Sequence, residues 1–206
     1  MNYVRWKETR RHRRVTVDAA PPLSVEHLSS CHVVQDRYAL LDALPKQAVV
    51  AEVGVLFGDF SEEILRRTEP RELHLIDIED RWGDRFEGEA DRVHTHRGSS
   101  TQILANFPDG YFDWIYIDAD HRYESVRADA EIAKHKIKPA GLLVFNDYMT
   151  YNPICDVSYG VARAVHELCR EDHWRLNYMA LESVGFFDVV ISRIQPASVA
   201  PTSSGK

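Results

Sequence analysis

The chain has 206 residues, a formal net charge of −7 and 44% hydrophobic residues. These values fit one α/β domain with a sizeable core, and the negative charge does not favour a nucleic-acid partner. No apolar run approaches the roughly 18 residues that a membrane helix needs, and the N-terminus lacks the apolar stretch of a secretory signal. The three cysteines are widely spaced and form no CxxC pair, which favours reduced thiols and a cytoplasmic protein.

The two ends of the chain differ in composition from the middle. Residues 1–24 form a basic arm that ends at two prolines, and a solvated arm is favoured there over a polyanion-binding segment. Residues 196–206 are rich in Ser, Pro and Ala and are expected to be disordered. One domain is therefore expected between residues 25 and 195.

Within this domain, strands and helices are predicted to alternate. Residues 24–44 predict one or two short helices ended by Pro45. A strand at 48–54, a helix at 59–68 with Asp59 or Ser61 as N-cap, and strands at 72–78 and 92–98 follow. The later elements are a helix at 100–107, a strand at 112–118, a helix at 123–137 ended by Pro139, a strand at 142–147 and a helix at 159–172. Residues 174–181 and 185–194 predict a closing hairpin. The pattern predicts a doubly wound, mostly parallel seven-stranded sheet with one antiparallel edge strand.

The turn between the first strand and the helix after it is glycine-rich. Its sequence is AEVGVLFGDFS, in which Gly54 and Gly58 are spaced Gly-x-x-x-Gly and Leu56 stands where a dinucleotide fingerprint needs its middle glycine. Glu52, near the end of a buried strand, is costly unless something cationic pairs with it. Asp77 ends the next strand, where an acid can take both ribose hydroxyls. A nucleoside that carries positive charge fits this turn better than a nicotinamide dinucleotide, although a tight turn without a ligand is the simpler alternative.

Five segments occur in the order and spacing of a known family. They are AEVGVLFGDFS, LHLIDIED, RGSS, FDWIYIDADHRYESVRAD and IKPAGLLVFNDY. Over residues 45–195 the chain resembles class I S-adenosylmethionine-dependent methyltransferases, and most closely bacterial small-molecule O-methyltransferases and the catechol-type, metal-dependent branch.

The resemblance implies a Rossmann-like fold and a set of cofactor contacts. Glu52, Gly54 and Gly58 would surround the methionine part of S-adenosylmethionine, Asp77 would hold the ribose, and the Ser99-Ser100 turn would lie by the adenine. Asp118, which ends a strand expected to face the same turn, is also expected to contact the cofactor.

Polar side chains end two strands that are expected to be neighbours. Asp118 ends the strand at 112–118, and Asn146 and Asp147 end the strand at 142–147. Adjacent parallel strands can deliver these side chains to one point, and an oxygen-only ligand set suits Mg²⁺, Mn²⁺ or Ca²⁺ better than zinc. The resemblance implies the same metal site, because the family places an Asp at position 118 and an acid–amide pair at 146–147. The family's order in this pair is Asp-Asn, whereas this chain has Asn-Asp. The alternative is that Asp118 only caps the next helix.

Two of the residues that follow Asp118 in the sequence are candidate general bases. His121 stands where the resemblance places a base lysine, and imidazole can accept a proton near neutral pH. Asp120 is the competing base, since an acid at this position is thought to serve in some sugar O-methyltransferase relatives. His94 and His96 lie on one face of the strand at 92–98, where packing or exposure is more common than metal ligation.

The leading hypothesis is an O-methyltransferase that acts on a small hydroxylated acceptor and uses S-adenosylmethionine, assisted by a divalent cation such as Mg²⁺. Two alternatives stay open: an NAD-dependent oxidoreductase, and a non-catalytic nucleoside-binding or partner protein on the same fold. The sequence leaves the acceptor unnamed and a homodimer open.

Overall fold

The structure is a computed structural model, and it describes residues 19–182 and 185–194. Most of the basic arm, residues 1–18, and the whole predicted tail at 196–206 lie outside the described residues. Residues 19–24 lead into a short helix, α1 (Val25–Leu28).

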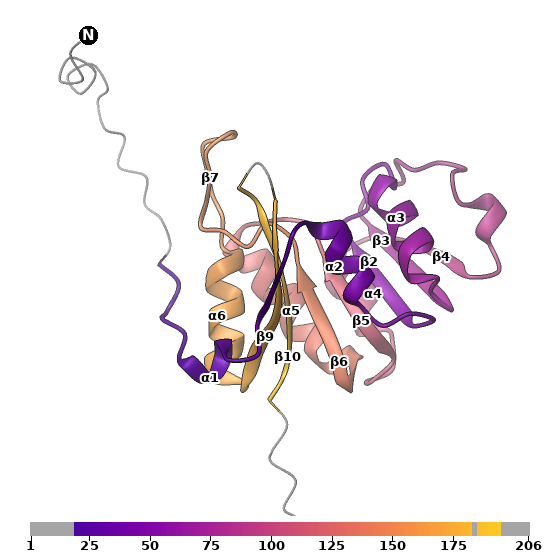
Figure 1. Cartoon of the computed structure of the whole chain (residues 1–206). Helices are drawn as coiled ribbons and strands as arrows, with labels where there is room; N and C mark the ends of the chain where they lie inside the picture. Colours follow the sequence, from indigo (N-terminus) through magenta and orange to yellow (C-terminus); the bar gives the residue numbers. More distant parts are fainter. Residues whose placement is uncertain (1–18, 183–184, 195–206) are drawn as a thin grey trace, which may run out of the picture.

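One large sheet organises the described part of the chain (Figure 1). Its eight strands run in the order β1-β9-β10-β6-β5-β2-β3-β4. Their bounds are β1 (His32–Val34), β2 (Val49–Val53), β3 (Glu72–Asp77), β4 (Val93–Arg97), β5 (Phe112–Ile117), β6 (Ile137–Phe145), β9 (Trp174–Leu181) and β10 (Phe187–Arg193). β10 is antiparallel to β6 and β9, whereas the other pairs in this sheet are parallel.

Helices cover both faces of the sheet, so it is doubly wound (Figure 1). α2 (Arg37–Ala43) and α3 (Asp59–Thr68) pack on one face through residues such as Leu40 and Ile64. α4 (Ser100–Ala105), α5 (Tyr123–Lys136) and α6 (Val161–Glu171) pack on the other face through residues such as Ala130 and Val165. A 3₁₀ turn, η2 (Glu87–Glu89), lies in the connection between β3 and β4.

The predicted α/β class and the closing hairpin are confirmed, and two details of the sheet are wrong. The sheet has eight strands in the described residues, because residues 32–34, predicted to be helical, form β1 and pair in parallel with β9. The antiparallel strand is β10, which lies inside the sheet between β6 and β9 and not at an edge. β10 lies inside because it pairs with β6 on one side and with β9 on the other, and the pairing of β9 with β1 places β9 inside the sheet as well.

Two element boundaries also differ from the prediction. The N-cap of α3 is Gly58, whose φ of 84° suits glycine, while Asp59 and Ser61 lie inside the helix. α5 ends at Lys136, and β6 begins at once, so Pro139 lies within the strand and not before it. Pro139 is exposed near the start of β6, where the register with β5 shifts.

The described ranges contain no helix that combines the length and the apolar character needed to cross a membrane. All three cysteines are free: Cys31 is half-buried, Cys155 is exposed and Cys169 is buried.

Candidate active site

The carboxyl ends of β2, β5 and β6 lie side by side. The backbone N–H of Asp118 donates to the Val53 carbonyl at 2.7 Å, and the N–H of Asn146 donates to the Ile117 carbonyl at 3.0 Å. These bonds continue the parallel ladder one residue past the strands, so the polar residues that follow are held in register.

Gly54 ends β2 at the same edge, with a φ of 89°. A Cβ added at Gly54 would lie 2.1 Å from the backbone oxygen of Asp118. The close approach of β5 therefore requires glycine here, whether or not a ligand is bound.

The side chains predicted to share a metal converge on one atom, Nε2 of His121. This nitrogen lies 3.2 Å from Oδ1 of Asn146, 3.5 Å from Oδ1 of Asp118 and 3.5 Å from Oδ2 of Asp147. When Asp118 and Asp147 are ionised, all three oxygens are acceptors, and Nε2 then carries a proton. The ring of Tyr159 stacks on His121 with centroids 4.6 Å apart, which fixes the plane of the imidazole.

A second polar group, which was not predicted, lies beside this point. Asp188 of β10 has a side chain only 1% exposed and accepts from the Tyr116 hydroxyl at 2.6 Å and from Nδ2 of Asn146 at 2.9 Å. Arg37 of α2 lies 3.6 Å from Asp188 and 3.4 Å from Asp118. Arg37 therefore joins the network around β10 to the predicted site.

Arg37 is held in place by more than charge. Its Nη2 donates to the Tyr116 hydroxyl at 2.5 Å, and its guanidinium lies 4.1 Å from the ring centroid of Phe60. The cation is thus sandwiched between an aromatic ring of α3 and the acids at the end of the sheet.

Negative charge is in excess at this edge. Asp118, Asp147 and Asp188 face Arg37 as their shared cation. Burial raises the pKa of Asp118 to about 8, with Arg37 acting against the shift and the two other aspartates adding to it. Burial also raises the pKa values of Asp147 and Asp188. A ligand with positive charge would relieve this excess.

Glu52 adds a further acid beneath the site. It is 1% exposed, and the Ser61 hydroxyl donates to its carboxylate. Burial raises the pKa of Glu52 to about 8, the Ser61 hydrogen bond opposes the shift, and Asp118 adds to it. The apo protein therefore holds Glu52 largely protonated at neutral pH.

A cavity of about 760 Å³ opens beside these strand ends. Five of the seven residues predicted to bind the cofactor line it: Gly54, Asp77, Ser99, Ser100 and Asp118. The other two, Glu52 and Gly58, are not on its wall. Glu52 is buried below it, and the Cβ direction of Gly58 is filled by the ring of Phe86 at 2.8 Å.

Asp77 and Ser100 are both committed to local hydrogen bonds on the cavity wall. Asp77 accepts from the N–H groups of Val55 at 2.8 Å and Leu56 at 3.0 Å. Burial opposes ionisation of Asp77, but these backbone donors hold its pKa below the usual value. The Ser100 hydroxyl donates to Asp129 at 2.5 Å. Asp77 thus reaches the cavity as a carboxylate that also ties the glycine turn to β3.

Asp120 lies next to His121 but has other partners. Arg122 pairs with its carboxylate at 2.7 Å, and the Ser125 hydroxyl donates to it at 2.7 Å. The Arg122 guanidinium, more than any other group, lowers the pKa of Asp120 to about 2. A carboxylate this acidic is a weak proton acceptor at neutral pH.

A smaller cavity of about 200 Å³ lies on the other side of His121. It is lined by residues 119–122 and by Cys155, Val157 and Tyr159. The last three come from the hairpin of β7 (Tyr151–Asn152) and β8 (Val157–Ser158), which was predicted only as a loop. Ala119, Asp120 and His121 line both cavities, so this turn stands at the boundary between them.

Residues Arg37, Tyr116, Asp188 and Tyr159 were missed by sequence reasoning. Asp188 had a signal, because an acid inside the apolar run GFFDVVIS needs a partner just as Glu52 does. Arg37 had none, since a surface-type arginine at the start of a short helix does not reveal what it contacts.

Comparison with known proteins agrees with this geometry. Residues 51–148 match the family model described as a methyltransferase domain. Over these residues the chain is similar to a methyltransferase domain. No curated protein matches the chain.

Several solved structures share the fold of this chain. Cofactor-bound Rv0187 from MTB is 20% identical with a TM-score of 0.60, over 77% of this chain and 78% of that one. The 1,6-didemethyltoxoflavin-N1-methyltransferase from Burkholderia thailandensis, bound to 1,6-didemethyltoxoflavin and S-adenosylhomocysteine, is 16% identical with a TM-score of 0.56, over 75% and 74%. An O-methyltransferase family protein from the same organism is 12% identical with a TM-score of 0.59, over 76% of this chain and 55% of that one. At these identities the likeness shows the fold alone.

Replacing the buried acid Glu52→Gln is expected to stabilise the protein as the pH rises. The folded pKa of about 8 exceeds the unfolded value of about 4.5, so the wild-type protein loses stability between these pH values as only the unfolded state releases the proton. The difference in melting temperature between variant and wild type should grow from pH 5 to pH 8, to at least roughly 2–4 °C. Scanning fluorimetry across this range checks it, with the exposed Glu87→Gln as control; a constant difference would contradict the protonated state of Glu52.

Removing the shared cation by Arg37→Met is expected to destabilise the protein by about 2–3 kcal/mol, because Asp188 then stays buried without a cation. Urea unfolding measures this loss. The double variant Arg37→Met/Asp188→Asn should recover part of it, whereas Arg66→Met, which removes an exposed pair with Glu63, should cost at most about 0.5 kcal/mol. Additive losses in the double variant would show that Arg37 and Asp188 are not coupled.

Proposed function

We propose that the protein transfers the methyl group of S-adenosylmethionine to a hydroxyl of a small-molecule acceptor. The observation that carries this proposal is the place of His121 between the two cavities, with its Nε2 held by Asn146, Asp118 and Asp147. The larger cavity suits the cofactor and the smaller one the acceptor.

The larger cavity has the features that S-adenosylmethionine needs. Asp77 offers a carboxylate to the ribose hydroxyls, and the turn at Ser99 and Ser100 borders the far end of the cavity. The cluster of acids around Asp118 favours a sulfonium, because a positive charge there stabilises the ionised carboxylates that burial otherwise disfavours. The same field disfavours the diphosphate of NAD.

His121 is the proposed general base. Its Nε2–H is directed at the Asp118 and Asp147 carboxylates, which leaves Nδ1 as the ring atom that can take the acceptor's proton. The two carboxylates then stabilise the imidazolium that forms, as the aspartate does in a catalytic triad. The acceptor oxygen forms its bond to the methyl carbon as the carbon–sulfur bond breaks, and the proton stays on Nδ1. Asp120 is assigned a structural role at the start of α5, because Arg122 and Ser125 occupy its carboxylate.

A divalent cation is part of the proposal. The oxygens of Asp118, Asn146 and Asp147 surround Nε2 of His121, and once the imidazole moves aside they offer the hard ligands that Mg²⁺ prefers. Bound there, the cation would lower the pKa of the acceptor hydroxyl. The same oxygens hold the His121 Nε2–H, so cation binding competes with this position of the imidazole.

The small cavity and the hairpin above it support a compact acceptor. Tyr159 and Val157 give it an apolar wall, while residues 119–122 give it a polar one. The proposal also places the protein in the cytoplasm, where the three free cysteines would stay reduced.

Substitutions of the two candidate bases distinguish the role of His121 from that of Asp120. His121→Gln is expected to lower kcat about 10²-fold or more, because a positioned base typically contributes 10²–10⁴-fold, while the affinity for S-adenosylmethionine stays within a few-fold. Asp120→Asn should keep kcat within about one order of magnitude. Formation of S-adenosylhomocysteine with a panel of hydroxylated acceptors is the readout. A larger loss in Asp120→Asn than in His121→Gln would reverse the assignment.

Calorimetry tests the cofactor and the cation directly. Titration with S-adenosylmethionine, S-adenosylhomocysteine and NAD, each with and without Mg²⁺, is expected to give heat with the first two only. Binding of NAD alone would overturn the methyltransferase proposal. Activity that is unchanged by chelation of Mg²⁺ would overturn the cation and leave His121 as the base.

A further inference from the structure

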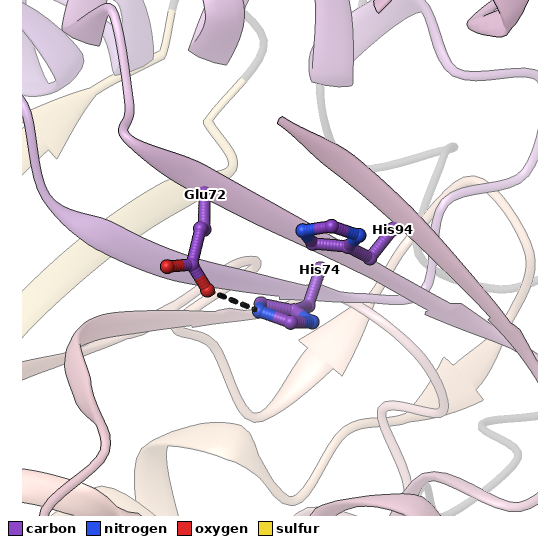
Figure 2. A group of neighbouring side chains, drawn as sticks. All are labelled: Glu72, His74 and His94. Atoms are coloured by element: carbon purple, nitrogen blue, oxygen red, sulfur yellow. Dashed lines mark hydrogen bonds and ion pairs between the residues drawn. The ribbon is translucent and has the colours of Figure 1, made fainter. Parts of the chain in front are cut away.

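Three side chains able to bind a metal gather on β3 and the edge strand β4, away from the residues that line the cofactor cavity. Glu72, His74 and His94 each place one nitrogen or oxygen within 4.8 Å of the other two (Figure 2). His74 and His94 are direct partners in the parallel register of the two strands. We call these three residues the β3–β4 cluster.

Hydrogen bonds already orient two members of the β3–β4 cluster. His74 is 5% exposed, and its Nδ1 lies 3.0 Å from Nε2 of His96. Its Nε2 faces the Glu72 carboxylate at 3.4 Å (Figure 2). The Tyr111 hydroxyl donates to the same carboxylate oxygen at 2.6 Å. The neighbours His96 and Tyr111 thus fix the His74 ring and the Glu72 carboxylate from behind.

The third member, His94, is not explained by this hydrogen-bonded chain. Its ring packs over His74 with centroids 4.9 Å apart, and Figure 2 shows it on the same side of the strands as Glu72. A chain from Glu72 through His74 to His96 would be complete without it.

We propose that the β3–β4 cluster binds a zinc ion through the Glu72 carboxylate, Nε2 of His74 and a ring nitrogen of His94. Two imidazoles and one carboxylate suit zinc, whereas Mg²⁺ prefers oxygen ligands only. The cluster therefore differs in chemistry from the oxygen site at the end of β5 and β6. Three protein ligands leave a fourth position for water.

The spacing of the three ligand atoms fits zinc after a small movement of the side chains. Zinc bonds of roughly 2.0–2.2 Å in a tetrahedron place neighbouring ligand atoms about 3.3 Å apart. The 3.4 Å between His74 and Glu72 already matches this value. Glu72 and His94 are half-buried at the edge of the sheet, where side-chain rotation can close the remaining gap.

The contact with His96 is compatible with the tautomer of His74 that zinc requires, because Nε2 of His96 can accept as well as donate. When Nδ1–H of His74 donates to His96, Nε2 presents its lone pair to the Glu72 side, which is the pattern found behind histidines that bind metals. Without a cation this tautomer sets a lone pair against a carboxylate. Zinc between them turns that repulsion into two bonds.

Zinc at this place would tie the edge strand β4 to β3. β4 is paired on one side only, and it leads into Gly98 and Ser99 on the wall of the larger cavity. The ion would thus hold one wall of that cavity from outside it.

Competition against a chromophoric zinc chelator tests the proposal, with millimolar Mg²⁺ present to occupy the oxygen site. The full chain should bind one zinc ion tightly. Glu72→Gln and His94→Ala each remove one ligand and leave the buried His74 unchanged, so each should weaken zinc binding about 100-fold or more. Tyr111→Phe removes the hydroxyl that orients Glu72 and should weaken zinc binding roughly 10-fold. The exposed His135→Ala is the matched control and should bind as the wild type does.

The variant Asp147→Asn changes the oxygen site and leaves the β3–β4 cluster intact, so it distinguishes the two metal sites. Circular dichroism checks that each variant folds. Zinc binding that survives Asp147→Asn and is lost in His94→Ala supports the proposal. Equal binding in all variants, loss in Asp147→Asn instead, or no binding at micromolar zinc would overturn it. A rise in melting temperature with zinc in the wild type and not in His94→Ala gives a second readout, independent of methyl transfer.

Discussion

The structure depends on how acids from several strands are kept together at one edge of the sheet. The parallel strands β2, β5 and β6 end at the same edge, and the antiparallel β10 begins there. The backbone alone therefore brings together four acids, Glu52, Asp118, Asp147 and Asp188. Burial makes this arrangement expensive, and the protein meets the cost partly with Arg37 and partly by keeping Glu52 protonated. The proposed affinity of the site for a cation rests on the acids that Arg37 leaves unpaired.

The same constraint explains the position of β10. An antiparallel strand inside a parallel sheet carries Asp188 back to the carboxyl ends of β5 and β6, where Tyr116 and Asn146 donate to it. Asn146 is therefore shared: its Nδ2 binds Asp188, and its Oδ1 faces His121. The amide links the buried network to the proposed base, so a change at Asp188 is expected to be felt at His121 without direct contact.

The separation along the chain of the residues that interact decides how much of the structure the sequence could predict. The strands and the Asp118, Asn146 and Asp147 convergence were predictable, because apolar periodicity and the geometry of neighbouring parallel strands are short-range rules. The contacts of Arg37 were not, since residues 37 and 188 are brought together only by the complete sheet. β1 was missed for the same reason: three residues have no periodicity of their own, and pairing with β9 makes them a strand.

The choice of base shows where local sequence and tertiary structure give different answers. Asp120 and His121 are adjacent and both follow β5, so their spacing from Asp118 does not separate them. The structure gives the two residues different surroundings: Arg122 and Ser125 lower the pKa of Asp120, while His121 is directed at two carboxylates, and this difference supports the proposed choice of His121. The partner of Asp120 is an arginine close to it in sequence, whereas Asn146 and Asp147 reach His121 only because the fold places β6 beside β5. For that reason the proposed chemistry rests on the meeting of β5 with β6, and the motif DADHR alone does not determine it.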